Sequence, residues 1–361
     1  MDICGRIYGY MVNIKSLQIT SDILTIIAEI DEFKGAWRAL GQLAPEHLNS
    51  LKKVATIESI GSSTRIEGSK LTDKEVEALL SNLKIKKFAT CDEQEVAGYA
   101  EVMNLIFQNY AHIPFTENYI QQLHDELLQY SEKDSWHRGR YKKSPNQVEA
   151  FGPDGKSLGV IFETSSPFET PIRMAELVDW ATQMLTDKKL HPILITAIFI
   201  VEFLAIHPFQ DGNGRLSRVL TTYLLLRSGY AYVPYSSMEA VIEQSKEGYY
   251  LSLRQTQGTL KTDTPNWQPW ILFFLRAMRQ QKHLLEIKLE KEKLLLGLLP
   301  ELSLQILELI KSRGRITNSE IVMITKANRN TVKKHLETLV AGQHLQKNGI
   351  GKGTWYSLKN T

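Results

Sequence analysis

The sequence predicts a mainly α-helical protein that carries short β-hairpins. Over most of residues 20–295, apolar side chains recur at intervals near 3.6 residues, the period of a helix with one buried face. Strand-like patterns are confined to a segment near residue 150, to the C-terminus and to a possible N-terminal hairpin. Apolar residues make up 43% of the 361 residues, an ordinary share for a globular protein, and this length suits two or three domains.

Helices are predicted one after another along most of the chain. Thr72-Asp73-Lys74-Glu75 is a capping box that begins one of them. The apolar segment Pro192–Ile206 precedes a second apolar segment that follows Arg218. The same periodicity predicts helices over Asp31–Leu40, Leu48–Ser62, Asp73–Lys84, Gln94–Asn109, Thr116–Tyr130, Met174–Leu185 and Trp267–Leu296.

A polar, glycine-rich segment, residues 207–218 (HPFQDGNGRLSR), joins those two apolar segments. Gly212 and Gly214 let the main chain approach a ligand closely, and the free N–H groups of a following helix favour negative charge. Arg215 and Arg218 lie three residues apart, so both can occupy one helix face, an arrangement that suits a polyphosphate. The segment therefore predicts a phosphate site at a helix N-terminus.

Three further side chains give this segment its chemistry. Asp211 stands where a carboxylate could hold Mg²⁺ that bridges phosphate oxygens. His207 is the natural base, because imidazole titrates near neutral pH. We expect Phe209 to bury its ring and to fix the loop.

Residues 207–218 match the motif of the Fic family, H-x-F-x-[D/E]-G-N-G-R-x-x-R, at every defined position, and the chain resembles that family. Fic proteins most often transfer AMP from ATP to a protein hydroxyl. The resemblance implies a Fic helical core with a β-hairpin flap and an N-terminal helical extension. It also implies that His207 is the general base, that Asp211 binds Mg²⁺, and that attack falls on the α-phosphorus of ATP.

The resemblance further implies which residues bind the nucleotide. The loop residues would hold the α- and β-phosphates, and the two arginines would hold the β- and γ-phosphates. The implied nucleotide-binding residues are Asp211, Gly212, Asn213, Gly214, Arg215, Leu216, Ser217 and Arg218.

An upstream run, residues 63–68 (STRIEG), has two interpretations. By itself it is an ordinary helix end, with Gly68 after the C-cap. It is also similar to the inhibitory motif of the Fic family, [S/T]-x-x-x-E-[G/N], with Ser63, Glu67 and Gly68 in the defined places. A carboxylate that pairs with Arg218 would displace the γ-phosphate, so we expect Glu67 to inhibit transfer. The resemblance also allows Glu67 to orient a water that removes AMP.

Residues 144–155 (SPNQVEAFGPDG) are typical of a β-hairpin, with strand character around 148–151 and turn chemistry in Pro153-Asp154-Gly155. An ordinary surface hairpin is the alternative interpretation. The resemblance makes this hairpin the flap that clamps the main chain of the target protein, with Gln147, Val148 and Glu149 as the flap residues.

Tyr249 and Tyr250 are predicted to begin a helix after residues 243–247. Paired tyrosines usually pack at the edge of a core. In the Fic family, a tyrosine pair at this place lines the adenine pocket, with a polar residue eight positions after the first tyrosine. The resemblance therefore implies Tyr249 and Gln257 as nucleotide contacts.

The C-terminal segment is basic. Residues 303–361 hold ten Lys and Arg against three acids, a net charge of +7, which leaves −4 for the rest of a chain whose total is +3. Pro300 is predicted to close a long charged helix that precedes it. The pattern then predicts helices over Leu304–Lys311, Asn318–Ile324 and Arg329–Ala341, followed by strands at 345–347 and 354–358.

This pattern resembles a winged helix-turn-helix. In that interpretation one helix faces a DNA major groove and Lys352 reaches the DNA backbone from the wing. A protein-interaction module is the alternative. The residues expected at the groove are Asn328, Arg329, Asn330, Thr331, Lys333 and Lys334.

Together these features predict four parts: an N-terminal helical region with the inhibitory motif (1–110), a Fic catalytic domain (111–285), a helical linker (286–302) and the winged helix (303–361). Cys4 and Cys91 offer no disulfide framework or metal spacing, and no segment has the pattern of a signal peptide or a membrane span. We therefore expect a cytoplasmic protein with no membrane partner.

The leading functional hypothesis is an autoinhibited protein adenylyltransferase that uses ATP and Mg²⁺ and modifies Ser, Thr or Tyr hydroxyls. Self-modification and a homodimer that modulates inhibition are compatible with it. One alternative is a DNA- or protein-binding regulator whose pocket only senses a nucleotide. A narrower alternative keeps the enzyme but changes the donor to one that supplies UMP or phosphocholine.

Overall fold

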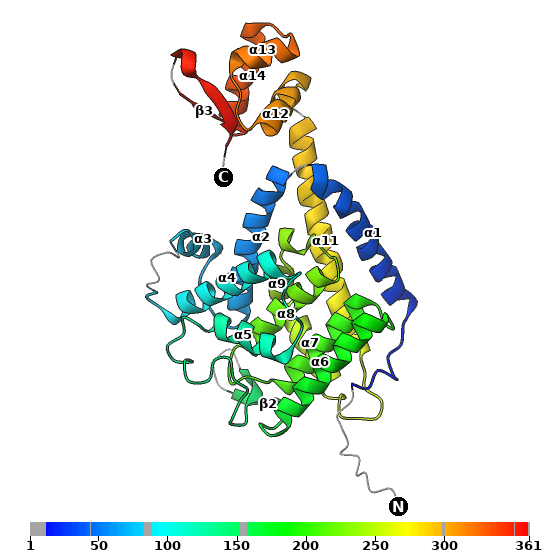
Figure 1. Cartoon of the computed structure of the whole chain (residues 1–361). Helices are drawn as coiled ribbons and strands as arrows, with labels where there is room; N and C mark the ends of the chain where they lie inside the picture. The colour runs from blue at the N-terminus through cyan, green and yellow to red at the C-terminus, as the bar shows by residue number, and fades with distance from the viewer. Residues whose placement is uncertain are drawn as a thin grey trace, which may run out of the picture. The chain divides into compact units, whose positions relative to one another are not determined.

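The computed structural model describes residues 12–43, 45–82, 88–151, 157–297, 300–349 and 351–359. Within these ranges the chain is mainly helical, as predicted, and it divides into two compact units, residues 1–284 and 285–361 (Figure 1). The division of the chain into four parts stays a prediction. None of the described helices is long and apolar enough to cross a membrane.

The N-terminal unit is built around two central helices, α7 and α8 (Figure 1). Every residue of α7 from Ile193 to Ile206 is buried, and so is nearly all of α8 as far as Leu226. A helix that is apolar on all sides must be covered by other elements. The helices of this unit are α1 (Ser21–Leu43), α2 (Pro45–Ile66), α3 (Asp73–Ser81), α4 (Cys91–Asn109), α5 (Glu117–Leu127), α6 (Glu169–Asp187), α7 (Pro192–Ile206), α8 (Asn213–Arg227), α9 (Met238–Gln244) and α10 (Lys246–Gln257), and α11 (Gln268–Gly297) begins in it.

The elements around α8 determine what reaches its N-terminus. α7 packs on α6 and α8, while α2 and α4 contact α8 from another side. Capping boxes begin α3 at Thr72 and α4 at Thr90, and the first of these was predicted. The contacts of α2 with α8 place the carboxyl end of α2 beside the amino end of α8.

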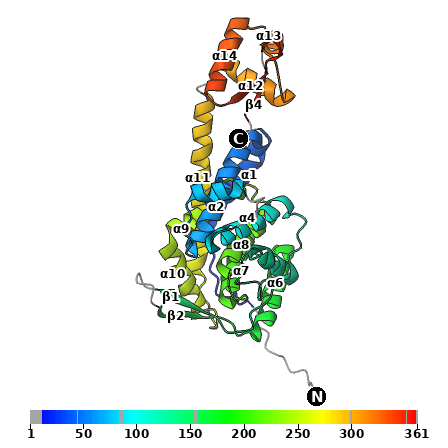
Figure 2. The same ribbon diagram turned by 90° about the vertical axis from the view of Figure 1, so that its left-hand side faces the viewer.

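In the N-terminal unit an antiparallel hairpin pairs β1 (Gln147–Phe151) with β2 (Ser157–Glu163), and β2 contacts α10 (Figure 2). Its pairing is irregular after Val148 and after Ala150. The hairpin was predicted at this place. Its predicted turn, Pro153-Asp154-Gly155, lies outside the described residues, and the side chains of Gln147, Val148 and Glu149 are likewise not described.

The C-terminal unit has its own core. It contains α12 (Glu301–Arg313), α13 (Asn318–Thr325), α14 (Arg329–Ala341) and a hairpin of β3 (Leu345–Asn348) with β4 (Trp355–Leu358). Ile316 pairs with Tyr356 as an isolated bridge. This order and pairing match the pattern that was predicted for a winged helix-turn-helix, and the assignment to that class stays a prediction. The core consists of Ile306, Leu307, Ile310, Ile316, Ile321, Val332, Leu336, Leu339, Leu345 and Tyr356.

Several predicted boundaries were wrong. α1 begins at Ser21, ten residues before the predicted start, and α2 continues to Ile66 through most of the inhibitory run. α10 begins at Lys246 and not at the tyrosine pair. α11 is described to Gly297 and Pro300 is the N-cap residue of α12, while residues 298–299 lie outside the described residues. The possible N-terminal hairpin falls mainly on residues 1–11, outside the described residues, and residues 12–20 form no strand.

Candidate active site

The candidate site begins where α7 ends. His207 is the C-cap of α7 and adopts a left-handed conformation, φ 53°, with its N–H bonded 2.9 Å from the Phe203 carbonyl oxygen. A non-glycine residue in this conformation is uncommon and is often found at functional sites. The α7 helix therefore ends at His207, whose side chain lies against the last turn of that helix.

The protonation state of His207 is the one that a general base requires. Its Nδ1 atom lies 3.3 Å from the Leu204 carbonyl oxygen, which can only accept, so Nδ1 carries the proton and Nε2 keeps a lone pair. Burial lowers the pKa of His207 to about 4, and the charges of Glu67 and Asp211 act on it in the opposite direction. The imidazole is therefore neutral at pH 7.

The loop after His207 is held by buried rings. Phe209 is fully buried, as predicted, and stacks on His124 with ring centroids 3.8 Å apart. His124 accepts the Gly139 N–H at Nδ1 (2.9 Å), and its Nε2 donates to the Asp211 carbonyl oxygen (3.0 Å). Burial lowers the pKa of His124 to about 4, so the ring is neutral. Sequence analysis missed His124, because its loop partner is 87 positions away.

Asn213 shapes the loop with its side chain. The amide accepts the Phe209 N–H (2.9 Å) and donates to the Phe209 carbonyl oxygen (2.7 Å). Gly212, with φ 77°, makes the turn into α8. Because the Asn213 side chain is engaged by Phe209, the group of Asn213 that can bind a phosphate is its main-chain N–H at the start of α8.

Asp211 and Arg215 face each other at the amino end of α8. Asp211 Oδ1 accepts the Gly212 N–H at 2.6 Å, and Asp211 Oδ2 lies 3.5 Å from Arg215 Nη2. Arg215 Nη1 also lies 3.1 Å from a carboxylate oxygen of Glu95 on α4. Burial raises the pKa of Asp211, but Arg215, the Gly212 N–H and Lys133 together outweigh it and hold the pKa below its usual value. Asp211 is thus an ionised carboxylate at neutral pH.

Arg218 is held by the inhibitory run of α2. Its Nε donates to Ser63 Oγ (2.8 Å), and its Nη2 donates to the Ser63 carbonyl oxygen (2.9 Å) and to Glu67 Oε1 (2.7 Å). Arg218 is only 3% exposed, while the Glu67 side chain is 33% exposed. Within the described part of the chain, Nη1 of Arg218 has no hydrogen-bond partner. The predicted contact between Glu67 and Arg218 is therefore present.

The end of α2 explains how Glu67 reaches Arg218. The Ser69 N–H bonds to the Thr64 carbonyl oxygen and the Gly68 N–H to the Arg65 carbonyl oxygen, both at 3.1 Å, which is the Schellman arrangement. Gly68 has φ 111°, in the region that favours glycine. The two interpretations of this run therefore agree, because the ordinary helix end is what places Glu67 at the C-cap and directs it toward α8.

The Glu67 carboxylate lies directly on the main chain of Gly214. A Cβ atom at Gly214 would overlap Glu67 Oε1 and closely approach the carboxyl carbon. Gly214 stands in the first turn of α8, where the helix N-terminus favours an anion. The carboxylate thus occupies a place with the properties of a phosphate site.

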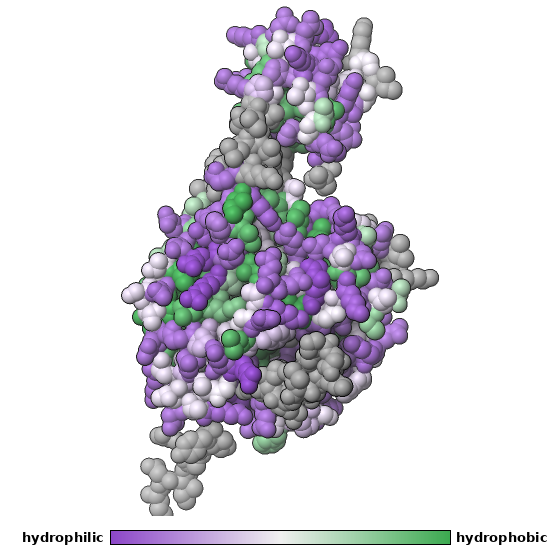
Figure 3. All heavy atoms as spheres, turned by 180° about the vertical axis from the view of Figure 1, so that it is seen from behind, coloured by the Kyte–Doolittle hydropathy of each residue, from purple (hydrophilic) through white to green (hydrophobic). Residues whose placement is uncertain are grey.

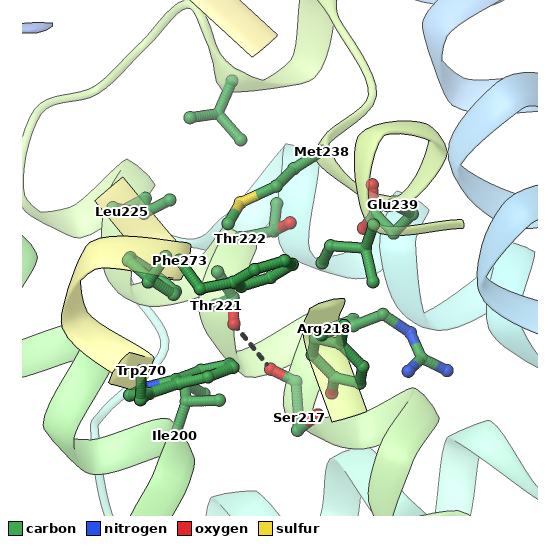
Figure 4. A pocket seen from close by; sticks show the side chains of 14 residues that line it. Ile200, Ser217, Arg218, Thr221, Thr222, Leu225, Met238, Glu239, Trp270 and Phe273 are labelled. Atoms are coloured by element: carbon green, nitrogen blue, oxygen red, sulfur yellow. Dashed lines mark hydrogen bonds between the residues drawn. The ribbon is translucent and has the colours of Figure 1, made fainter. Parts of the chain in front are cut away.

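Behind Arg218 lies a mainly apolar pocket between α8, α9, α10 and α11 (Figure 4). Trp270 and Phe273 form one wall of the pocket. Thr221 and Ser217 also line it, and the Thr221 hydroxyl donates to the Ser217 carbonyl oxygen (2.8 Å). Tyr249 lines this pocket, with its ring 5.8 Å from that of Trp270. Gln257 is buried further along α10 and does not line the pocket, so the structure does not bring the two predicted adenine contacts to one wall.

Two long-range contacts near residues 63–68 were missed in the sequence, and each of them involves one glutamate of α9. Arg65 forms a fork with Glu243 on α9, Nε to Oε1 at 2.7 Å and Nη2 to Oε2 at 3.0 Å. Glu239, also on α9, is fully buried and accepts from the Tyr99 hydroxyl at 3.2 Å. Burial raises the pKa of Glu239, and Arg218 acts to lower it. Neither pairing has a sequence signal, since the partners are more than a hundred positions apart.

Comparison with known proteins places this site in a family. A family model described as the Fic/DOC family matches residues 114–225. The chain is 27% identical over 244 residues to a protein named Protein adenylyltransferase Fic from Drosophila willistoni, covering 66% of this chain and 45% of that protein. The corresponding Drosophila mojavensis protein is also 27% identical and is covered over 44% of its length.

Residues 114–225 of this chain form a Fic domain. Two solved structures share its fold. A Fic family protein from Desulfovibrio desulfuricans matches 96% of this chain and 98% of its own, with a TM-score of 0.61 at 23% identity. A Fic-domain signalling protein from Bacteroides thetaiotaomicron matches 73% of this chain and 95% of its own, with a TM-score of 0.57 at 25% identity. The chain spans less than half the length of the two curated relatives, so what they do is a basis for proposals here.

Proposed function

We propose that this Fic protein is an autoinhibited protein adenylyltransferase that transfers AMP from ATP to a Ser, Thr or Tyr hydroxyl. The observation that carries the proposal is the position of the Glu67 carboxylate, which lies on Gly214 and pairs with Arg218 at the amino end of α8. An anion held there by a helix N-terminus and a buried guanidinium occupies a natural place for a phosphate group. The charge of this carboxylate acts to raise the pKa of His207, which burial lowers.

The residues support one sequence of events. His207 Nε2 takes the proton from the target hydroxyl, whose oxygen bonds to the α-phosphorus while the bond to the bridging oxygen of the β-phosphate breaks. Pyrophosphate leaves with that electron pair. The N–H groups at the start of α8 and the guanidiniums of Arg215 and Arg218 bind the phosphate oxygens. Two buried donors, Arg218 Nη1 and Arg215 Nε, have no hydrogen-bond partner among the described residues and are available for this role.

Asp211 fits a magnesium ion that arrives with the nucleotide. Its side chain is 46% exposed and its second oxygen is not hydrogen-bonded to the main chain. In the described residues no group of three or more His, Cys, Asp or Glu side chains could hold a metal. Mg²⁺ is commonly held by one or two carboxylates plus phosphate oxygens, so one carboxylate suffices. When bound, such an ion neutralises charge on the phosphate oxygens.

Inhibition by Glu67 follows from competition for Arg218. While Glu67 is bound to it, a γ-phosphate loses that partner, the α-phosphate is misaligned, and misplacement by about 1 Å can cost on the order of 10²-fold in rate. The same carboxylate is suited to orient water for removal of AMP from a modified target, so the balance between the two directions depends on Glu67.

The test is incubation with ATP labelled at the α-phosphate and Mg²⁺, comparing the wild type, Glu67→Gly and His207→Ala. We expect label on protein to rise by at least about tenfold in Glu67→Gly and to vanish when His207→Ala is added. Nucleotide binding without transfer in every variant would favour the nucleotide-sensing regulator instead. Transfer from UTP or CDP-choline, and not from ATP, would keep the enzyme and change its donor.

We also propose that the C-terminal unit binds duplex DNA. Asn328, Arg329, Asn330, Thr331, Lys333 and Lys334 are all exposed. They lie at the amino end of α14, which follows α13 after a link of three residues. The surface of this unit is largely hydrophilic (Figure 3), and residues 303–361 carry a net charge of +7. A basic helix face of this kind suits the phosphate backbone. The side chain of Lys352 lies outside the described side chains.

The DNA proposal is tested by measuring binding to a labelled duplex between 50 and 200 mM salt. Affinity should fall steeply with salt, because each phosphate contact releases counterions. The lack of any binding at low salt would leave the unit as a protein-interaction module.

A further inference from the structure

Two side chains just before the hairpin hold the main chain of the catalytic loop. Lys142 is 3% exposed and Asn146 is half-buried. Between them they bind four consecutive main-chain carbonyl oxygens, from the last residue of α7 to the buried Phe209. Lys142 Nζ donates to Ile206 (3.0 Å), Asn146 Nδ2 to His207 (3.3 Å), the Lys142 N–H to Pro208 (2.8 Å) and Asn146 Nδ2 again to Phe209 (2.8 Å).

The same two side chains close the open end of the hairpin. Lys142 Nζ donates to Asn146 Oδ1 (2.7 Å) and to Thr164 Oγ1 (2.9 Å). Asn146 immediately precedes β1 and Thr164 immediately follows β2, and the Thr164 hydroxyl lies 2.8 Å from the Asn146 carbonyl oxygen. One cluster thus ties both strands of the hairpin to the loop that carries His207.

We propose that Lys142 and Asn146 are positioning residues, which fix the imidazole of His207 relative to the hairpin. For its catalytic part this inference rests on the proposed function. The carbonyl contacts on either side of His207 set the orientation of its backbone, which is left-handed and unfavourable without support. The contacts to Thr164 and Asn146 set where β1 begins. Neither residue contacts the reacting atoms, so their effect is on geometry.

A buried lysine is suited to this role. Its ammonium group has three donors and no acceptor, and all three donors are used here, by a carbonyl, an amide oxygen and a hydroxyl. Burial and the neighbouring Arg173 lower the pKa of Lys142 to about 8, while Glu169 acts to raise it. The group is therefore charged at neutral pH in spite of its burial. Methionine has nearly the same shape without these donors.

The test compares Lys142→Met with Lys142→Arg, each in the Glu67→Gly background. A matched control is Lys143→Met, because Lys143 is the exposed neighbour on the same segment. We expect Lys142→Met to slow transfer of labelled AMP by about 10- to 100-fold while ATP affinity changes less than about twofold. Amide hydrogen exchange should become faster in 147–151 and 157–163 but stay unchanged in α2 and α4. Lys142→Arg should restore both readouts, since a guanidinium also donates to several acceptors.

The outcomes are distinguishable. If Glu67→Gly transfers no label at all, the proposed function fails, and exchange in the hairpin alone decides the positioning role. Unchanged hairpin exchange in a folded Lys142→Met protein overturns the inference, and so does exchange that is accelerated equally throughout the N-terminal unit. Should Lys142→Met not fold, Asn146→Ser carries the same expectation, because it removes the contacts to residues 207 and 209 and leaves the lysine in place.

Discussion

At the scale of single residues, the inhibition that we propose rests on competition for one guanidinium. Arg218 is buried, and three of its hydrogen bonds go to two residues of α2. Two of these bonds go to the uncharged Ser63, so in our proposal only the third, to Glu67, is exchanged for a phosphate oxygen. A buried charged group left without a partner is costly, and Ser63 therefore keeps Arg218 in place during the exchange.

The Glu67→Gln variant tests whether the Glu67 side chain weakens ATP binding through its charge or through its size. The amide has the size of the carboxylate but lacks its charge, and a charge-assisted hydrogen bond is stronger than a neutral one by about 1 kcal/mol. We expect ATP to bind roughly five- to tenfold more tightly to Glu67→Gln than to the wild type, as measured by calorimetry with a non-hydrolysable analogue. Glu77→Gln, an exposed acid on α3, is the control. Equal affinity for Glu67→Gln and wild type, with tighter binding for Glu67→Gly, would mean that bulk dominates.

His207 and His124 predict how stability depends on pH. Burial holds the pKa of both at about 4, against 6.5 for an unperturbed histidine. Between pH 6.5 and 4 the unfolded chain therefore binds more protons than the folded one, and the free energy of unfolding falls as the pH is lowered through this window. Urea unfolding followed at pH 7 and pH 5 should show a smaller loss for His207→Asn than for the wild type. The same loss in His207→Asn as in wild type and in His112→Asn, an exposed control, would contradict this account.

At the scale of elements, the proposed inhibition depends on how the end of α2 is fixed. The Schellman arrangement at Gly68 directs Glu67, and Arg65 fastens the same turn to α9 through Glu243. Arg65 Nη1 also reaches Asp73 on α3 at 2.9 Å. Three helices thereby define the position of one carboxylate, although Arg65 itself does not contact Arg218.

Arg65→Met should weaken inhibition without touching the nucleotide site. The Arg65 and Glu243 side chains are 23% and 30% exposed, so their pairing is expected to contribute about 1 kcal/mol. We expect self- or target-labelling to rise about fivefold in Arg65→Met. Glu243→Gln should match it, and the double variant should add little, because both changes remove one contact.

Lys53→Met is the matched control for this prediction. Lys53 lies on the same helix and pairs with Glu77 at 3.4 Å, but both side chains are more than half exposed, and such pairs contribute little. A rise in labelling in Lys53→Met equal to that in Arg65→Met would show that any loosening of α2 has this effect, and the specific role of Arg65 would be lost.

Much of this arrangement could be predicted from the sequence, because it is encoded locally. Apolar periodicity located the helices, the capping box at Thr72 located one start, and the loop 207–218 has its chemistry in one continuous run. Helix ends were less certain. α2 continues through residues 63–66 since nothing in that run breaks a helix before Gly68. Contacts between distant positions, such as Arg65 with Glu243 or Lys142 with residue 206, leave no local pattern and needed the fold.

At the scale of the whole molecule, the chain consists of two units with opposite charge. All of the candidate active-site residues lie in the unit that ends at residue 284, and the basic residues that we assign to DNA lie in the other. Residues 285–361 carry a net charge of +6 and residues 1–284 carry −3. An anionic polymer is therefore attracted to the C-terminal unit and repelled by the rest, apart from the nucleotide site itself.

Arg329→Ala tests where DNA contacts the C-terminal unit. Arg329 is the first residue of α14 and is exposed, so we expect it to contact a base edge or a phosphate. Loss of a base contact should weaken binding by about 1–3 kcal/mol and relax sequence preference, whereas loss of a phosphate contact should lower the salt slope by about 1. Arg276→Ala, which removes an exposed arginine from the N-terminal unit, should leave both quantities unchanged. Equal weakening by the two changes would mean that total charge, and not the face of α14, governs binding.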